Sequence, residues 1–358
     1  MKLCQHLCLL VSTLLLTPVT LAWQAEKITG ALSLPWGLAY INDNEMLVTE
    51  KMGTIKRVDL KTGRLQTLAT VPNVWPRGQG GLLDIARSPF DQHTLYLTYS
   101  KEVDGEGATT LAMATYRDQT ISAWRDLLVT RSRSDTGRHF GSRITFDSDS
   151  LYFSIGDRGE RDNGQNTLTH AGSILRLRPD GSVPTNNPFI NNQAVLDEIW
   201  SYGHRNPQGL FFDFDSDELW SIEHGPRGGD EINLIKKGAN YGWPITSHGK
   251  EYWGPISVGE ATEKEGIESP VKVYIPSIAP SSLVLYRGDK FPKLKGKLLA
   301  GALKLTHINI ITINDKGEAI AEQRILSDLG ERIRDIETTP SGEIFFITDN
   351  GNLYRLAP

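Results

Sequence analysis

The chain has 358 residues, with 38 Lys and Arg against 43 Asp and Glu, and a formal net charge of −5. This mildly acidic balance, without a long basic run, excludes nucleic acid as an expected partner. Both cysteines, Cys4 and Cys8, lie near the N-terminus. The rest of the chain must therefore be held together by its own core, without disulfides, and its length is sufficient for this.

The first 22 residues have the pattern of a secretory signal peptide. Lys2 gives a positive start, residues 7–16 form an apolar run, and residues 20–22 offer a cleavage region. The run is short for a transmembrane helix, although an uncleaved membrane anchor is the alternative. We expect residues 1–22 to be removed and the mature protein not to insert into a membrane. A cysteine-free exported chain fits the bacterial periplasm.

From residue 36 onward, an apolar strand, a short polar turn and a second apolar or aromatic strand recur. Such units start near residues 36, 82, 142, 209, 282 and 334. Strand-sized runs at this spacing, without a long helical period, indicate an all-β repeat protein. Six units of three to four strands predict a six-bladed β-propeller that forms a single domain spanning residues 23–358.

The two ends of the mature chain are expected to meet and close the ring. Residues 26–34 could pair with the last strand, at residues 352–356. The polar segments 156–172 and 179–198 are predicted to be long loops, and long loops in compact domains are usually functional or mobile.

Two polar clusters directly precede the first strand of a unit, where a propeller would present them near its axis. His139, within residues 138–143, could act as a general base because its pKa lies near neutrality. Arg205 and Asn206 offer planar hydrogen bonding to carboxylates or carbonyls. The alternatives are a surface histidine and a structural turn ahead of Pro207.

Two further clusters suggest charged ligands. Lys304, Arg332 and Arg334 would converge on the axis and favour an anionic ligand, unless they are solvated surface charges. The Gly- and Pro-rich turn within residues 223–233, followed by residues 238–244, brings carboxylates and main-chain carbonyls together. Oxygen ligands of this kind suit Ca²⁺.

Taken together, these clusters resemble the soluble quinoprotein glucose and aldose sugar dehydrogenases, which use pyrroloquinoline quinone (PQQ). The matching segments are Gly78–Asp84, Gly137–Arg143, Ile155–Gly159, Gly203–Gly209, Glu223–Asn233, Gly301–Lys304 and Arg332–Arg334. The resemblance covers nearly the whole mature chain. The compact length is closer to the broad-specificity aldose branch than to the longer glucose-specific branch.

The resemblance implies oxidation of aldose sugars at C1 to lactones, with hydride transfer to PQQ and an external electron acceptor. It implies His139 as the general base and Arg205 as a catalytic residue that stabilises the reduced cofactor. The implied PQQ contacts are Gln79, Arg205, Asn206, Tyr252, Ala302, Leu303, Lys304, Arg332, Ile333 and Arg334. The implied ligands of a Ca²⁺ on PQQ are the carbonyls of Gly225 and Pro226, and those of a second, structural Ca²⁺ are Glu231 and Tyr241.

The chain departs from the family pattern at two places. Arg138 stands where the glucose branch has an Asp before the catalytic histidine, which leaves the orienting partner of His139 open. The glutamine that touches PQQ after the Ile-Gly-Asp motif could correspond to Asp162 or Gln165. The preferred sugar, and whether the protein is a monomer or a homodimer, stay open.

Two other functional classes fit the same propeller. A Ca²⁺-dependent hydrolase of the lactonase type would also place oxygen ligands at the axis, but it would not need three cations beside the metal. A non-catalytic binding propeller would leave His139, Arg205 and the cations without a purpose.

Overall fold

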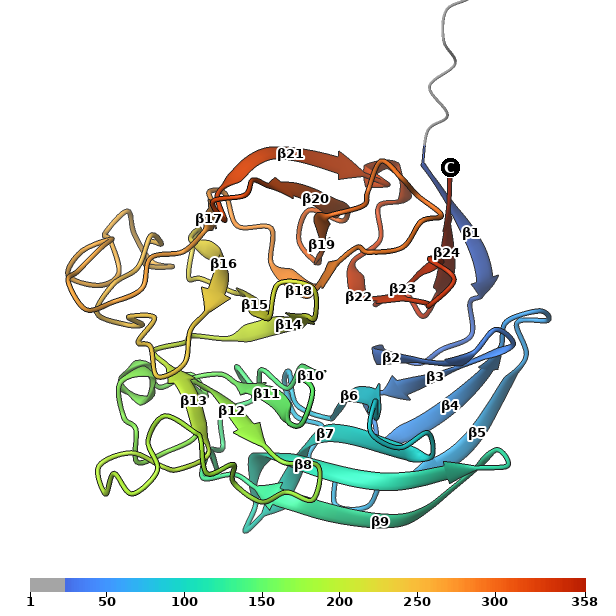
Figure 1. The fold of residues 1–358 in the computed structure, drawn as a ribbon, viewed down its shortest axis with the longest axis horizontal. Helices are drawn as coiled ribbons and strands as arrows, with labels where there is room; N and C mark the ends of the chain where they lie inside the picture. Colours follow the sequence, from blue (N-terminus) through green and yellow to red (C-terminus); the bar gives the residue numbers. More distant parts are fainter. Residues whose placement is uncertain (1–22) are drawn as a thin grey trace, which may run out of the picture.

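The computed structural model describes residues 23–358, so the expected signal peptide and both cysteines lie outside the described residues. Six four-stranded antiparallel sheets are arranged in a ring (Figure 1). The predicted six-bladed β-propeller is therefore confirmed. Within residues 23–358, no helix is long and apolar enough to span a membrane.

In each blade, the first strand lies nearest the ring axis and the later strands follow outward (Figure 1). Blade 1 comprises β2 (Pro35–Asn42), β3 (Glu45–Glu50), β4 (Thr54–Asp59) and β5 (Leu65–Thr70). Blade 2 comprises β6 (Leu82–Arg87), β7 (Thr94–Val103), β8 (Glu106–Arg117) and β9 (Thr120–Val129). Blade 3 comprises β10 (Ile144–Phe146), β11 (Leu151–Ile155), β12 (Ser173–Leu177) and β13 (Ile199–Tyr202).

The second half of the ring repeats this order. Blade 4 comprises β14 (Pro207–Asp213), β15 (Glu218–Glu223), β16 (Asp230–Ile235) and β17 (Lys272–Tyr274). Blade 5 comprises β18 (Pro280–Leu285), β19 (Lys297–Ala302), β20 (Ile308–Ile313) and β21 (Ala319–Ile325). Blade 6 comprises β22 (Ile333–Thr338), β23 (Ile344–Thr348), β24 (Leu353–Ala357) and β1 (Gln24–Thr29). Two short 3₁₀ helices, η1 (Arg161–Gly164) and η2 (Ser327–Leu329), lie in connections.

The ring closes through the two ends of the chain, as the sequence predicted. β1 pairs antiparallel with β24, with Gln24 opposite Ala357. The Arg355 guanidinium also pairs with the Glu26 carboxylate at 2.6 Å. Because β1 forms the outer strand of the last blade, both ends of the described chain are held in the same sheet.

The hydrophobic core is divided among the junctions between neighbouring blades. At the junction of blades 1 and 2, for example, Leu47 and Ile55 pack with Leu82, Leu95 and Leu97. Comparable buried clusters lie at the other five junctions. Since alternate residues of a strand face opposite sides, each blade contributes to two such clusters.

Arg143, just before β10, connects the blades at the axis. Its guanidinium lies 2.8 Å from a carboxylate oxygen of both Asp84 and Asp335. It also donates to the main-chain carbonyls of Gln208 and Ser281 at 3.1 and 3.0 Å. The ring of Trp36, in blade 1, lies 4.5 Å from the guanidinium carbon. The Arg143 side chain therefore contacts the other five blades and holds their inner strands together at the axis.

Candidate active site

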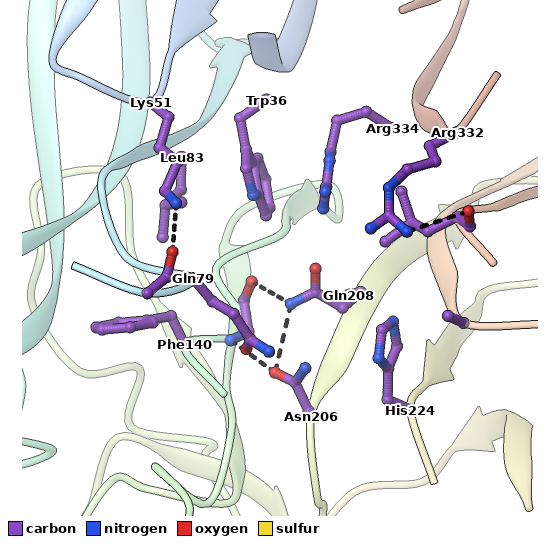
Figure 2. Close-up of a pocket in the computed structure, with 14 residues that line it drawn as sticks. Trp36, Lys51, Gln79, Leu83, Phe140, Asn206, Gln208, His224, Arg332 and Arg334 are labelled. Atoms are coloured by element: carbon purple, nitrogen blue, oxygen red, sulfur yellow. Dashed lines mark hydrogen bonds between the residues drawn. The ribbon is translucent and has the colours of Figure 1, made fainter. Parts of the chain in front are cut away.

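A cavity of about 210 Å³ lies where the inner strands begin. Its wall contains five residues predicted to contact a cofactor: Gln79, Asn206, Leu303, Arg332 and Arg334. Figure 2 shows the amides of Gln79, Asn206 and Gln208 on one side and the two arginines on the other. The propeller therefore brings together polar groups that lie up to about 255 positions apart in the sequence.

His139, next to this wall, is paired with a buried carboxylate. Its Nδ1 lies 2.5 Å from Oδ1 of Asp157, and its backbone N–H donates to the Gln79 side-chain oxygen at 2.7 Å. The other oxygen of Asp157 accepts the indole N–H of Trp243 at 2.8 Å. Asp157 is thus the orienting partner that the sequence left open, and Nε2 of His139 stays available for a proton.

The electrostatics of this pair favour a neutral imidazole beside an ionised carboxylate. Burial lowers the pKa of His139, and the Arg205 charge adds to this, while the bond to Asp157 partly opposes it. Burial alone would raise the pKa of Asp157, but His139, Arg205 and the Gly159 amide hold it below its ordinary value. A neutral histidine oriented by a carboxylate is the arrangement that a general base needs.

Arg158 supports the backbone on both sides of His139. Its buried guanidinium donates to the carbonyl of Arg138 and lies 3.4 Å from the ring centre of Phe140. It also donates to the Ser132 carbonyl at 3.1 Å. Burial lowers its pKa to about 9. His139 itself has φ = +54°, an uncommon conformation that needs such external support.

The cations of the cavity differ from the predicted trio. Arg332 and Arg334 line the wall, and both bond to Asp349, at 2.7 and 2.8 Å. Lys304 is exposed and does not line the cavity, whereas Lys51 does. Burial, reinforced by the Arg334 charge, lowers the pKa of Lys51. The three cations of the wall are therefore Lys51, Arg332 and Arg334.

Ala302 and Ile333, also predicted as cofactor contacts, are fully buried and belong to the apolar clusters of blades 4 to 6. Because side chains alternate along a strand, Arg332 and Arg334 reach the cavity while Ile333 packs in the core. Any contact of Ala302 or Ile333 with a ligand would therefore involve the main chain.

The predicted calcium residues surround a second, much smaller cavity of about 20 Å³. Gly225, Pro226, Glu231 and Tyr241 all line it, together with Glu223. Burial and the nearby Glu223 carboxylate raise the pKa of Glu231. Two crowded carboxylates beside a hole of atomic size suit a divalent cation. The phenol of Tyr241 is committed to the Leu234 carbonyl at 2.6 Å, so only its carbonyl could act as a ligand.

Arg205 already contacts the turn that carries Gly225 and Pro226. Its Nη1 donates to the Gly225 carbonyl at 2.7 Å and to the His224 carbonyl at 3.1 Å. Among residues 23–358, no group of three or more His, Cys, Asp and Glu is arranged to hold a metal. A Ca²⁺ at Gly225 and Pro226 would therefore depend on carbonyls and would have to share Gly225 with Arg205.

The remaining predicted contacts lie outside the larger cavity. Tyr252 is 65% exposed, with its hydroxyl 3.5 Å from Arg205. Asp162 is exposed in η1, and Gln165 donates to the Trp243 carbonyl at 2.7 Å. Neither Asp162 nor Gln165 lines the cavity, so the structure gives no basis for choosing either as a cofactor contact.

Sequence reasoning missed Lys51 and His224 as wall residues, although a signal was present. Each follows the second strand of its unit directly, as Leu303 does in blade 5. The second strand of each blade runs antiparallel to the first, so it ends on the face of the propeller where the first strand begins. The residue directly after a second strand therefore repeatedly faces the cavity. Burial lowers the pKa of His224 to about 3, which makes it a neutral part of the wall.

Comparison with known proteins places this geometry in a family. Residues 32–355 match the model of the glucose/sorbosone dehydrogenases. The chain belongs to this family. It is 38% identical to the aldose sugar dehydrogenase YliI of Escherichia coli strain K12, over 98% of this chain and 96% of that protein.

Two solved structures of aldose sugar dehydrogenases are also similar. The apo-form of the soluble enzyme from Escherichia coli superimposes with a TM-score of 0.89 at 37% identity, covering 94% of this chain and 99% of the other. The PQQ-bound form of the enzyme from Streptomyces coelicolor gives a TM-score of 0.78 at 28% identity, covering 94% and 97%. The expected family membership is therefore confirmed.

Proposed function

We propose that this chain is a PQQ-dependent aldose sugar dehydrogenase that oxidises the C1 hydroxyl of an aldose to a lactone. The observation that carries the proposal is the oriented pair His139–Asp157 beside a cavity lined by Lys51, Arg332 and Arg334. The family match and the PQQ-bound structural neighbour support the choice of cofactor.

The residues of the cavity fit an anionic, planar cofactor. PQQ carries three carboxylates, and the three cations of the wall would neutralise them. The amide side chains of Gln79 and Asn206 would add hydrogen bonds to its polar edge. When bound, PQQ would accept the hydride from C1 of the sugar; the protein supplies position and charge.

His139 would take the proton of the C1 hydroxyl on Nε2, because Nδ1 is held by Asp157. The resulting imidazolium would be stabilised by the ionised Asp157 carboxylate. Proton removal by a positioned base contributes roughly 10²–10⁴-fold to the rate. The buried pair and its bond from Trp243 keep the imidazole in one orientation.

Ca²⁺ held by the carbonyls of Gly225 and Pro226 would act as a Lewis acid next to the cofactor. The carboxylate of Glu231 and the carbonyl of Tyr241 would hold a structural Ca²⁺ in the smaller cavity. Arg205, which touches the Gly225 carbonyl, would stabilise negative charge at the same edge. We further propose that a signal peptide directs the protein to the periplasm.

Reconstitution tests the function directly. Apo-protein is mixed with PQQ, Ca²⁺ and glucose, and reduction of an artificial electron-acceptor dye is followed by absorption. We expect dye reduction that requires PQQ and is abolished by a calcium chelator. PQQ binding without dye reduction across a panel of aldoses would contradict sugar oxidation, and a lack of PQQ binding would favour a hydrolase or a binding propeller.

A further inference from the structure

Gln208, the second residue of the inner strand β14, lines the 210 Å³ cavity and has no part in the chemistry proposed above. The residue is 7% exposed. Its side-chain nitrogen donates to the Gly141 carbonyl and to Oδ1 of Asn206, each at 3.3 Å. Figure 2 shows the side-chain oxygen of Gln208 on the opposite side of the amide, directed toward Arg334. A buried acceptor is therefore turned into the cavity.

The hydrogen bonds around Gln208 determine which end of its amide is the oxygen. The backbone N–H of Gly141 donates to the Asn206 side chain at 3.2 Å, so the atom that receives it is the oxygen Oδ1. The Gln208 atom that faces both Oδ1 and the Gly141 carbonyl faces two acceptors, so it must be the nitrogen. Oε1 accepts no hydrogen bond from any residue between 23 and 358. This oxygen is thus left for a ligand.

Most other polar side chains of the cavity present donors. Gln79 accepts the His139 backbone N–H on its oxygen at 2.7 Å, which leaves its nitrogen for a ligand. The nitrogen of Asn206 is likewise left, because its oxygen already accepts two hydrogen bonds. The remaining donors are the cations Lys51, Arg332 and Arg334. A ligand of this cavity should therefore accept hydrogen bonds at most positions and donate one to Gln208, since a buried acceptor without a donor costs free energy.

Among the described residues that line the cavity, His224 is the other side chain that can accept a hydrogen bond from a ligand. Its Nε2 lies 2.5 Å from the Pro280 carbonyl, which can only accept, so Nε2 carries the proton and Nδ1 has the free electron pair. His224 directly precedes Gly225 and lines the 20 Å³ cavity as well as the larger one. Of these two cavities, Gln208 lines only the larger. Gln208 is therefore the acceptor that lies beside a cation and apart from the proposed calcium turn.

The proposed cofactor has a single hydrogen-bond donor. In oxidised PQQ with ionised carboxylates, the carboxylates, the two quinone oxygens and the pyridine nitrogen all accept, and the pyrrole N–H alone donates. This N–H lies between two of the three carboxylates, away from the pyridine nitrogen and the C5 carbonyl. A wall in which an acceptor lies beside an arginine is complementary to this edge, because the guanidinium can bind a carboxylate while the acceptor binds the N–H.

We propose that the side-chain oxygen of Gln208 accepts the pyrrole N–H of PQQ and so determines which edge of the cofactor faces Arg334. The inference rests on the proposed function, because it takes PQQ as the cofactor. A cofactor turned the other way would place its acceptors against the Gln208 oxygen and leave its own donor unpaired, and sites with buried polar groups reject such mismatches strongly. In the selected orientation the C5 carbonyl is left for the turn that carries Gly225 and Pro226.

The test compares PQQ with its N1-methyl derivative, which has the same carboxylates but no pyrrole donor. Both are titrated into apo-protein in the presence of Ca²⁺, and the Kd values come from quenching of protein fluorescence, so no turnover is needed. The variant is Gln208→Met, which has nearly the same size and lacks the amide. Gln79→Met is the matched control, because it removes an amide that presents a donor to the same cavity. Urea unfolding verifies that each variant is folded.

The ratio of the two Kd values, methylated over unmethylated, isolates the proposed hydrogen bond. The bulk of the methyl group disfavours binding to the wild-type protein and to Gln208→Met alike, so it cancels when the ratios are compared. We expect the wild-type ratio to exceed that of Gln208→Met by about tenfold, since a hydrogen bond to a buried acceptor is worth roughly this factor. Gln79→Met should weaken the binding of both molecules and keep the wild-type ratio. Gln208→Asn, whose oxygen is withdrawn by one methylene group, is a second variant that should lose the discrimination.

Other results would overturn this role of Gln208. Equal ratios in the wild-type protein and both Gln208 variants, with tight binding of PQQ, would show that the pyrrole N–H lies elsewhere. A ratio that falls only in His224→Phe would place the N–H against His224. Unchanged Kd values in Gln208→Met together with a raised KM for glucose would make Gln208 a sugar contact. If PQQ does not bind the wild-type protein at all, the proposed function itself fails, and this result is distinct from equal ratios with tight binding.

Discussion

The guanidinium carbon of Arg158 lies 3.4 Å from the ring centre of Phe140, stacked closely against its face. Both residues are at most 1% exposed. Arg158 directly follows Asp157, and Phe140 directly follows His139, so this contact joins the two segments that carry the base and its orienting carboxylate. The position of the imidazole thus depends on a cation that forms no ion pair with any carboxylate of residues 23–358.

Replacing Arg158 with Met should therefore impair catalysis more than cofactor binding. The change removes the bonds to the carbonyls of Ser132 and Arg138, and small displacements of catalytic groups can cost about 10²-fold in rate. We expect kcat to fall by about 10–100-fold, with an unfolding free energy lower by about 1–3 kcal/mol. Steady-state kinetics, PQQ titration and urea unfolding measure the three quantities.

Arg178, whose side chain is 41% exposed, provides a matched control, because Arg178→Met removes a guanidinium nearer the surface of the same blade. Arg158→Lys distinguishes charge from geometry, since lysine keeps the charge but cannot bridge several carbonyls. A wild-type kcat in Arg158→Met, once the variant is shown to be folded, would contradict the positioning role.

Asp157→Asn tests the orienting partner of the base. The amide cannot stabilise an imidazolium, so we expect kcat to fall by roughly 10²–10⁴-fold while PQQ still binds. The bond from Asp157 raises the pKa of His139 against the effect of burial. Its loss should therefore shift the acid limb of the kcat/KM profile to lower pH. Asp162→Asn, at an exposed carboxylate of η1, should leave the profile unchanged.

The fold could be predicted because each blade is formed by a contiguous segment with its own pattern of strands and turns. Six repeats of this pattern along the chain indicate six blades in a ring. The alternation of apolar and polar positions even places Arg332 and Arg334 on one side and Ile333 on the other. The sequence-based prediction listed all three as cofactor contacts, since motif matching does not apply that alternation.

The site was harder to predict because its residues meet either through strand pairing within a blade, as His139 and Asp157 do around β10 and β11, or through closure of the ring. Nothing in the spacing of 18 residues between His139 and Asp157 indicates that their side chains meet. Lys304 stays a predicted cofactor contact, and the lining of the cavity by Lys51 shows the same limit. Lys304 lies next to a wall residue in sequence but faces solvent, whereas Lys51 comes from blade 1 across the ring.

Lys51 and Lys304 can be compared directly as cofactor contacts. We expect Lys51→Ala to weaken PQQ binding by about tenfold or more, because a charge-assisted bond contributes about 1.5–3 kcal/mol. Lys304→Ala should change the Kd by less than about threefold. Titration of apo-protein with PQQ, followed by fluorescence, gives both constants. A larger loss in Lys304→Ala would show that the loop after β19 moves onto the cofactor.

A last prediction concerns stability and Glu337, on the inner strand β22. Burial and the nearby Asp335 carboxylate raise the pKa of Glu337 to about 8, and its hydrogen bond from the Tyr40 amide is long, at 3.4 Å. Below about pH 4, the folded and unfolded chains both carry this proton. Between about pH 4.5 and 8, the unfolded chain loses the proton while the folded chain keeps it, so this group lowers the free energy of unfolding as the pH rises.

Glu337→Gln removes this titration while keeping the size of the side chain and an oxygen acceptor for Tyr40. The variant should be more stable than the wild-type protein by about 4 kcal/mol at pH 8, and the difference should vanish near pH 4. Urea unfolding at a series of pH values measures it, with Glu160→Gln at an exposed position as the control. Equal stabilities at pH 8 would show that the carboxylate of Glu337 ionises in the folded protein without cost, as it would if solvent reached it through the cavity that Glu337 lines with Tyr40 and Asp335.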